Sequence, residues 1–176
     1  MRVPQVTFKT RVRDEVIPGD NPYRWQDISS RALFDNKKVV LFALPGAFTP
    51  TCSLFQLPGY DQLYAQFKSF GVDEIYCLSV NDAFVMNAWA KSESVENVKM
   101  LPDGNGEFTR KMGMLVHKDN LGFGMRSWRY AMLVDDGNIQ AMWIEPGFED
   151  NSQSDPYVES IPESVLLHVK DILMSK

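Results

Sequence analysis

The chain has 176 residues, of which 44% are hydrophobic and 23% are charged, and this composition is typical of an ordinary globular protein with one core. Its formal net charge of −5 excludes a general nucleic-acid binder, because no excess of basic side chains is available to neutralise phosphates. No stretch approaches the ~20 apolar residues that cross a bilayer, so we expect no membrane partner. We predict a single domain over residues 1–176.

Apolar runs of strand type and of helix type alternate along the chain. In order, they are a strand at residues 39–44, a helix at 51–70, a strand at 75–80, a helix at about 82–91, a strand at 98–101, a helix at 107–112, a hairpin of strands at 129–134 and 139–144, and a helix after residue 160. This order predicts an α/β fold, namely a thioredoxin-like three-layer sandwich with a central mixed β-sheet.

Local features give several of these elements their ends and bends. The strand at residues 39–44 is apolar throughout, which predicts a central strand covered on both faces. Pro58 should kink the long helix, and Asp82 is placed to cap the helix that follows it. Ser160 and Glu163 have the spacing of a capping box, which predicts the start of the last helix.

Residues 45–52, PGAFTPTC, join the end of the first strand to the start of the long helix, where open α/β sheets bind ligands. Thr49 is placed as the N-cap and Pro50 as the first helical residue, so Cys52 is the third. The unpaired amide groups of this turn and the helix dipole both favour a thiolate. The hydroxyl of Thr49 can lie beside the sulfur and hold a substrate oxygen there. We therefore predict that Cys52 is reactive, although an isolated cysteine is most often a small buried hydrophobe.

Cys77, the other cysteine, lies in the middle of a strand and is predicted to be a core thiol. It lies about three residues, or ~10 Å, below the end of its strand. A disulfide requires Cβ atoms within about 4.5 Å, so a bond to Cys52 would need local unfolding. Two unpaired cysteines and an N-terminus without a secretory signal lead us to expect a cytoplasmic protein.

The pattern Pro45-x-x-x-Thr49-x-x-Cys52 resembles the active-site signature of the peroxiredoxins. The surrounding segments resemble the peroxiredoxin-5 subfamily, in particular its bacterial members fused to or served by glutaredoxin; they are residues 45–53, 57–59, 77–82 and 127–131. The resemblance extends from about residue 3 to residue 173.

The resemblance implies a thiol peroxidase that reduces hydrogen peroxide and organic hydroperoxides through Cys52, the peroxidatic cysteine. It implies that Thr49 positions the peroxide and that Pro45 shields the sulfur from water. Arg129 would stabilise the thiolate and polarise the O–O bond. The backbone amide groups near Gly46 and Cys52 would bind the peroxide oxygens.

Some members of the subfamily carry a resolving cysteine in a late loop, but residues 149–155 contain none, and no glutaredoxin segment with a C-x-x-C motif follows. We therefore expect a one-cysteine enzyme that an external thiol regenerates. Glutathione with glutaredoxin is the first candidate and thioredoxin the second. The resemblance also implies a homodimer in antioxidant defence, without metal, haem or flavin.

Other interpretations remain open from the sequence. Oxidation of Cys52 in a redox sensor would alter partner binding without turnover, and a thioredoxin-like scaffold would have no activity. A Cys–His protease would need His117 or His168, which are far from the cysteine in sequence, and these residues do not have zinc-site spacing. Arg129 alone would suit a surface ion pair at a strand edge, and Arg126 is a rival for its role.

Overall fold

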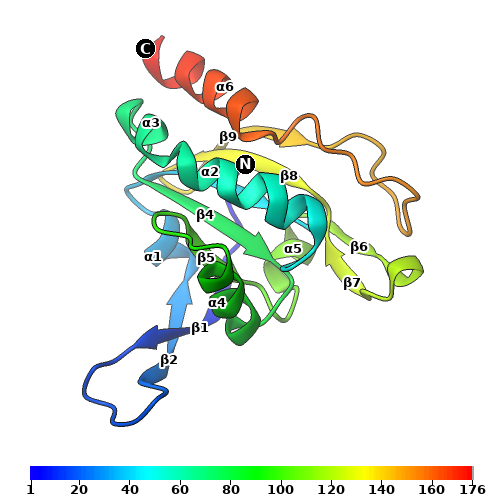
Figure 1. Ribbon diagram of the computed structural model, residues 1–176. Helices are drawn as coiled ribbons and strands as arrows, with labels where there is room; N and C mark the ends of the chain where they lie inside the picture. Colours follow the sequence, from blue (N-terminus) through cyan, green and yellow to red (C-terminus); the bar gives the residue numbers. More distant parts are fainter. Residues whose placement is uncertain (176) are drawn as a thin grey trace.

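The central sheet of the computed structural model, which describes residues 1–175, has five strands in the order β5-β4-β3-β8-β9 (Figure 1). Their bounds are β3 (Lys38–Ala43), β4 (Glu74–Ser79), β5 (Lys99–Pro102), β8 (Tyr130–Asp135) and β9 (Asn138–Ile144). Strands β3, β4 and β5 are parallel, whereas β8 and β9 run antiparallel to their neighbours, so the sheet is mixed, as predicted. Residue 176, the end of the predicted domain, lies outside the described residues.

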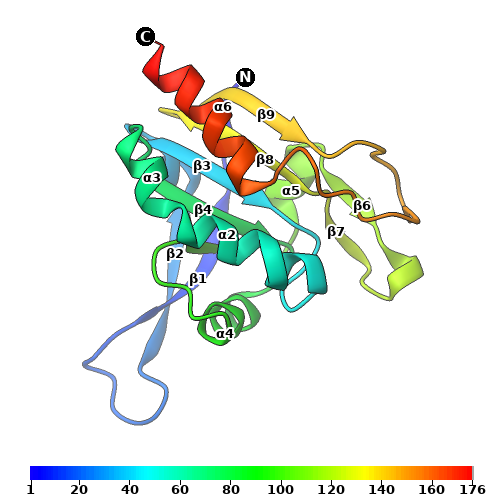
Figure 2. The ribbon, with the colours of Figure 1, turned by 45° about the horizontal axis from the view of Figure 1, so that its top comes forward.

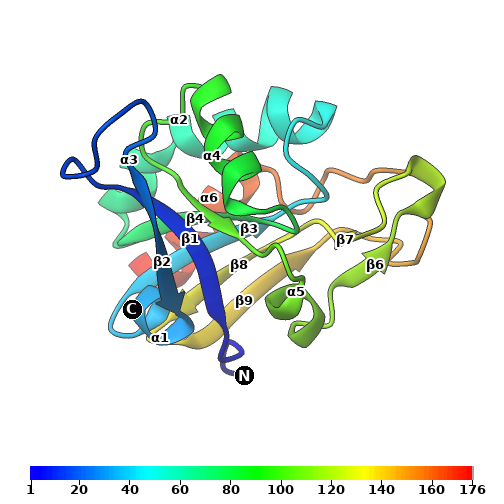
Figure 3. The ribbon, with the colours of Figure 1, turned by 90° about the horizontal axis from the view of Figure 1, so that it is seen from below.

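Alternate side chains of β3 enter two hydrophobic cores, one on each face of the sheet. Val40 and Phe42 belong to the core beneath α2 (Leu57–Gln62), α3 (Tyr64–Ser69) and α6 (Pro162–Met174) (Figure 2). Val39 and Leu41 belong to the core formed with β1 (Thr7–Arg13), α1 (Ser30–Phe34) and α5 (Glu107–Lys111), which cover the opposite face (Figure 3). These layers confirm the predicted thioredoxin-like sandwich and the strand buried on both faces.

The remaining elements lie around this sandwich. Helix α4 (Ala83–Ser92) packs beside β5, and its capping by Asp82 is confirmed, because Oδ1 of Asp82 accepts a hydrogen bond from the amide of Val85 at 2.9 Å. Six elements had not been predicted: β1, its partner strand β2 (Tyr23–Ser29), the short helix α1, the two strands of the β6–β7 hairpin (Leu115–His117 and Met125–Ser127), and the 3-10 helix η2 (Asp119–Leu121). Among residues 1–175, no helix is long and apolar enough to span a membrane.

The predicted long helix is interrupted twice. It begins at residue 50 and turns at once into a π-helical stretch, η1 (Cys52–Gln56), in which the amide of Leu57 donates to the carbonyl oxygen of Cys52. Pro58 follows in the first turn of α2. Because proline has no amide hydrogen, it cannot donate a hydrogen bond to the preceding turn, and the π-helical stretch ends just before it. A second break at Leu63 (φ −90°, ψ 1°) separates α2 from α3.

The predicted capping box of the last helix is wrong. Helix α6 starts at Pro162 after Ile161, and no side chain caps it. The hydroxyl of Ser160 instead donates to Oε2 of Glu145 at 2.7 Å. A buried carboxylate thus takes the hydroxyl that the sequence pattern assigns to the helix end.

Candidate active site

The segment before Cys52 begins the helix as predicted. The carbonyl oxygen of Thr49 accepts a hydrogen bond from the amide of Ser53 at 3.0 Å, which makes Thr49 the N-cap and Cys52 the third helical residue. The hydroxyl of Thr49 does not cap the helix but donates to the carbonyl oxygen of Gly46 at 2.7 Å. Because this bond uses the hydroxyl hydrogen, the lone pairs of the oxygen are left to accept a hydrogen bond.

The sulfur of Cys52 is buried but not isolated from polar groups. Its side chain is 0% exposed, and its Sγ lies 3.4 Å from Nη1 of Arg129, which is 2% exposed. A hydrogen bond from a cation at this distance stabilises a thiolate over a thiol. The structure therefore brings together Cys52 and Arg129, which are 77 residues apart in the sequence.

Three groups hold the guanidinium of Arg129 in place. Nη1 donates to Oε1 of Gln56, and Nη2 donates to both carboxylate oxygens of Asp155 at 2.8 and 3.0 Å. The ring of Tyr157 lies 5.6 Å from the guanidinium carbon. Burial alone would disfavour the cation, but the charges and hydrogen bonds of Cys52 and Asp155 raise the pKa of Arg129 above its ordinary value. Nε, by contrast, is buried without a partner among residues 1–175.

The loop between β3 and the helix is fixed by side chains from other elements. Nη1 of Arg126 donates to the carbonyl oxygen of Pro45 at 3.0 Å, and Oδ1 of Asn81 accepts from the amide of Ala47 at 3.0 Å. A Cβ at Gly46 would lie 2.5 Å from Nη1 of Arg126, so this position has room only for glycine unless the arginine moves. Arg126 therefore supports the loop, and Arg129, not its rival, contacts the sulfur.

Asp155 and Tyr157 belong to the segment between β9 and α6, which Glu145 anchors. The carboxylate of Glu145, 1% exposed, accepts hydrogen bonds from the amides of Val158, Glu159 and Ser160 and from the hydroxyl of Ser160. The same hydroxyl accepts a hydrogen bond from Nε2 of Gln56. One network thus joins the late segment to the residues around Cys52.

A pocket of about 590 Å³ reaches Arg129, the residue that contacts the sulfur, although Cys52 itself does not line it. Its wall includes Pro45, Thr49 and Arg129, three of the predicted site residues. Phe123, from the glycine-flanked loop of the β6–β7 hairpin, lines it as well. The pocket therefore gives small molecules a path to the atoms that surround Cys52.

Cys77 does not take part in this arrangement. Both cysteines are free, and Cys77 is 0% exposed in the core of the same sheet face. Burial, together with the charge of Cys52, raises the pKa of Cys77 well above its ordinary value. A thiol held neutral in this way is a poor nucleophile, in agreement with the prediction of a core thiol.

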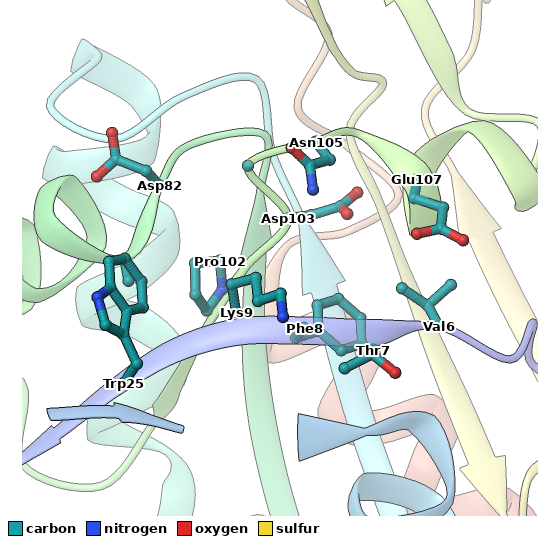
Figure 4. Close-up of a pocket in the computed structure, with 12 residues that line it drawn as sticks. Val6, Thr7, Phe8, Lys9, Trp25, Asp82, Pro102, Asp103, Asn105 and Glu107 are labelled. Carbon is teal, nitrogen blue, oxygen red and sulfur yellow. The ribbon is translucent and has the colours of Figure 1, made fainter. Parts of the chain in front are cut away.

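The other candidate groups lie elsewhere. The ring of His168 stacks on Trp143, and Nδ1 of His117 lies 3.4 Å from Asp119, so neither histidine is paired with Cys52. A smaller pocket of about 190 Å³ lies between β1 and the start of α4 (Figure 4), and its wall contains none of the predicted site residues. Residues 1–175 contain no group of three or more histidine, cysteine or acidic side chains that could hold a metal ion.

Comparison with known proteins gives a consistent result. Residues 22–157 match the Redoxin family. A curated peroxiredoxin of Rhizobium etli is 61% identical over 169 residues, which cover 96% of this chain and 94% of that protein. The crystal structure of the Plasmodium falciparum antioxidant protein, a 1-Cys peroxiredoxin, is 38% identical, with a TM-score of 0.90 over 97% of this chain and 98% of that one. Reduced Prx3 of Vibrio vulnificus in complex with hydrogen peroxide is 38% identical, with a TM-score of 0.78 over 96% of each chain.

Replacement of Glu145 by glutamine should destabilise the protein by about 2–4 kcal/mol, because one amide oxygen cannot replace a carboxylate that accepts from three backbone amides. Urea unfolding measures this loss. Glu159→Gln is the matched control, since its side chain is exposed in the same segment, and it should leave the midpoint unchanged. Equal midpoints for the two variants would show that the Glu145 network does not anchor the segment.

Proposed function

The chain belongs to the peroxiredoxin family of thiol peroxidases, and from this premise we propose that Cys52 is its peroxidatic cysteine and that an external thiol regenerates it. The observation that carries the proposal is the 3.4 Å contact between Nη1 of Arg129 and Sγ of Cys52 in a buried site. A fixed cation beside the sulfur stabilises the thiolate, which is the nucleophilic form of cysteine.

In the first step, the thiolate of Cys52 attacks the terminal oxygen of the peroxide. The O–O bond breaks, the sulfur is oxidised to a sulfenic acid, and the departing oxygen takes a proton and leaves as water or an alcohol. The unpartnered Nε–H of Arg129 is available to a peroxide oxygen, and the oxygen of Thr49 can accept the peroxide O–H. The amide groups of Gly46 and Cys52 are further donors, and Pro45 excludes water.

The substrates proposed are hydrogen peroxide and organic hydroperoxides. The Prx3 protein of Vibrio vulnificus, which is similar over 96% of this chain, binds hydrogen peroxide. The sulfur of Cys52 is 0% exposed, so a substrate has to enter from the pocket past Thr49 and Arg129. A small peroxide meets this requirement with the least movement of the site.

In the second step, one external thiol condenses with the sulfenic acid to give a mixed disulfide and water, and a second thiol releases Cys52 and leaves as a disulfide. The neutral, buried Cys77 and the absence of cysteine from residues 149–155 support this one-cysteine route. The similar Plasmodium protein is itself a 1-Cys peroxiredoxin. Glutathione with glutaredoxin is our first choice of reductant, and thioredoxin is the second.

Access for a thiol requires the first turn of the helix to loosen, because Cys52 has no exposed surface. The π-helical stretch Cys52–Gln56 supports such opening, since turns of this kind are less stable than an α-helix and recur at functional sites. The antioxidant role would be carried out in the cytoplasm, in keeping with two free thiols. A homodimer is also proposed, and the exposed apolar side chains of Phe48, Leu54 and Phe55 beside the site support it.

Replacement of Cys52 by serine should abolish peroxide consumption, by about 1,000-fold or more, because a hydroxyl is not ionised at neutral pH. Cys77→Ser, the matched control, should keep most of the activity. Peroxide consumption measured in parallel with glutathione/glutaredoxin and with thioredoxin tests both variants and identifies the reductant.

Circular dichroism shows whether each variant is folded, and Cys77→Ala replaces Cys77→Ser if the buried hydroxyl unfolds the protein. A folded Cys77 variant as inactive as Cys52→Ser would rule out the one-cysteine mechanism. Stoichiometric oxidation of the wild type without turnover in any thiol system would indicate a redox sensor instead of an enzyme.

A further inference from the structure

Lys118 has a largely buried side chain whose ammonium group faces an aromatic ring and has no hydrogen-bond partner among residues 1–175. Its backbone is fixed between β6 and η2, where its amide donates to the carbonyl oxygen of Gly124 at 2.8 Å. Its side chain is 4% exposed, and Nζ lies 5.5 Å from the centre of the Trp128 ring. Within residues 1–175 its ammonium group forms neither a hydrogen bond nor an ion pair. A buried charge is costly unless a group of opposite sign reaches it, so such a position points to an anionic ligand.

Lys118 lines the same pocket of about 590 Å³ that reaches Pro45, Thr49 and Arg129. Its charge is coupled to the site: burial lowers the pKa of Lys118, Asp155 raises it, Arg129 lowers it, and the Cys52 charge raises it. The charge of the Lys118 ammonium group therefore interacts with the charges of Cys52, Arg129 and Asp155.

The charge of the site changes during the proposed reaction. Lys118, Arg126 and Arg129 contribute three positive charges, while Asp155 and the thiolate of Cys52 contribute two negative ones, so the reduced site has one net positive charge. Oxidation to the sulfenic acid removes the thiolate charge and leaves two net positive charges. An anion is thus favoured more strongly at the stage when the reductant has to bind.

We propose that Lys118 binds a carboxylate of the peptide thiol that regenerates Cys52, with the peptide lying in the pocket between the β6–β7 hairpin and residues 152–155. This inference rests on the proposed one-cysteine function and adds a binding site for the reductant. The thiol condenses with the sulfenic acid: an S–S bond forms, the S–O bond of Cys52 breaks, and water leaves with the thiol proton. Lys118 is a binding residue and exchanges no proton in this step.

The walls of the pocket combine polar side chains with the apolar side chains of Pro50, Leu121 and Phe123, and this mixture suits a small peptide. Asn120, Ser152, Gln153 and Ser154 line it with amide and hydroxyl groups, which suit the peptide bonds of a tripeptide thiol such as glutathione. A carboxylate on a fatty-acid hydroperoxide has the same charge, but it would have to bind while the thiolate of Cys52 still carries its negative charge, whereas the reductant binds after that charge is gone. Both molecules would offer a carboxylate to Lys118, and we infer that this carboxylate belongs to the reductant and not to the peroxide.

The test compares glutathione with glutathione diethyl ester, which keeps the thiol and the peptide bonds but has no free carboxylate. Reduction of pre-formed sulfenic acid by each thiol is followed in the wild type, in Lys118→Met and in Lys91→Met, an exposed lysine on α4 that serves as control. The wild type and the control should react about tenfold faster with glutathione than with the ester, as expected for a hydrogen bond between charged groups. Lys118→Met should react with both thiols at rates within about twofold of each other.

Several results would overturn the inference. A wild-type preference retained in Lys118→Met, or an equal loss with glutathione, the ester and neutral dithiothreitol, would show that Lys118 does not recognise the carboxylate. A loss confined to a carboxylate-bearing hydroperoxide, with cumene hydroperoxide unaffected, would assign Lys118 to the peroxide. If the wild type turns over with dithiothreitol but not with glutathione, the binding role proposed for Lys118 is wrong and the proposed function stands. If no thiol supports turnover, the proposed function itself is wrong.

Discussion

The contact between the guanidinium of Arg129 and the sulfur of Cys52 imposes the main requirement on the rest of the structure. An ionised sulfur with no exposed surface loses the hydration that stabilises it in water, and a buried cation loses as much. In the thiolate form that we propose, each charge is tolerated because it lies beside the other, with Asp155 and Gln56 completing the set of partners. The orientation of one side chain, that of Arg129 directly before β8, thus determines whether the site is stable in its charged form.

This requirement explains why separate parts of the chain converge on the site. The helix start supplies Cys52 and Gln56, the link between β7 and β8 supplies Arg129, and the segment after β9 supplies Asp155. Glu145 fixes that last segment through three backbone amides, and it shares the hydroxyl of Ser160 with Gln56. A buried hydrogen-bond network of this kind favours one arrangement of the site, because each polar group has its partners only when all the others are in place.

Sequence reasoning found what is local and missed what depends on tertiary contacts. Residues 45–52 predicted the loop, the N-cap and the position of Cys52, since these follow from chain-neighbour chemistry. The role of Ser160 was misjudged because a buried carboxylate 15 residues away competes for its hydroxyl. Asp155 and Lys118 were missed for a related reason: each looks like an ordinary loop residue until the fold places it against Arg129 or the pocket. Strand β2 has mostly half-buried or exposed side chains, so it gave no apolar run to detect.

The most direct measurement of the central claim is the rate at which peroxide oxidises reduced Arg129→Lys in a single turnover, measured by stopped flow. Lysine keeps the charge but lacks the planar set of donors that serves Cys52, Gln56 and Asp155 at once. The account predicts a rate constant at least about 100-fold below that of the wild type, in a protein that circular dichroism shows to be folded. A rate within about threefold of the wild type would mean that any nearby positive charge suffices. This result would contradict the claim that the reaction requires the geometry of the guanidinium.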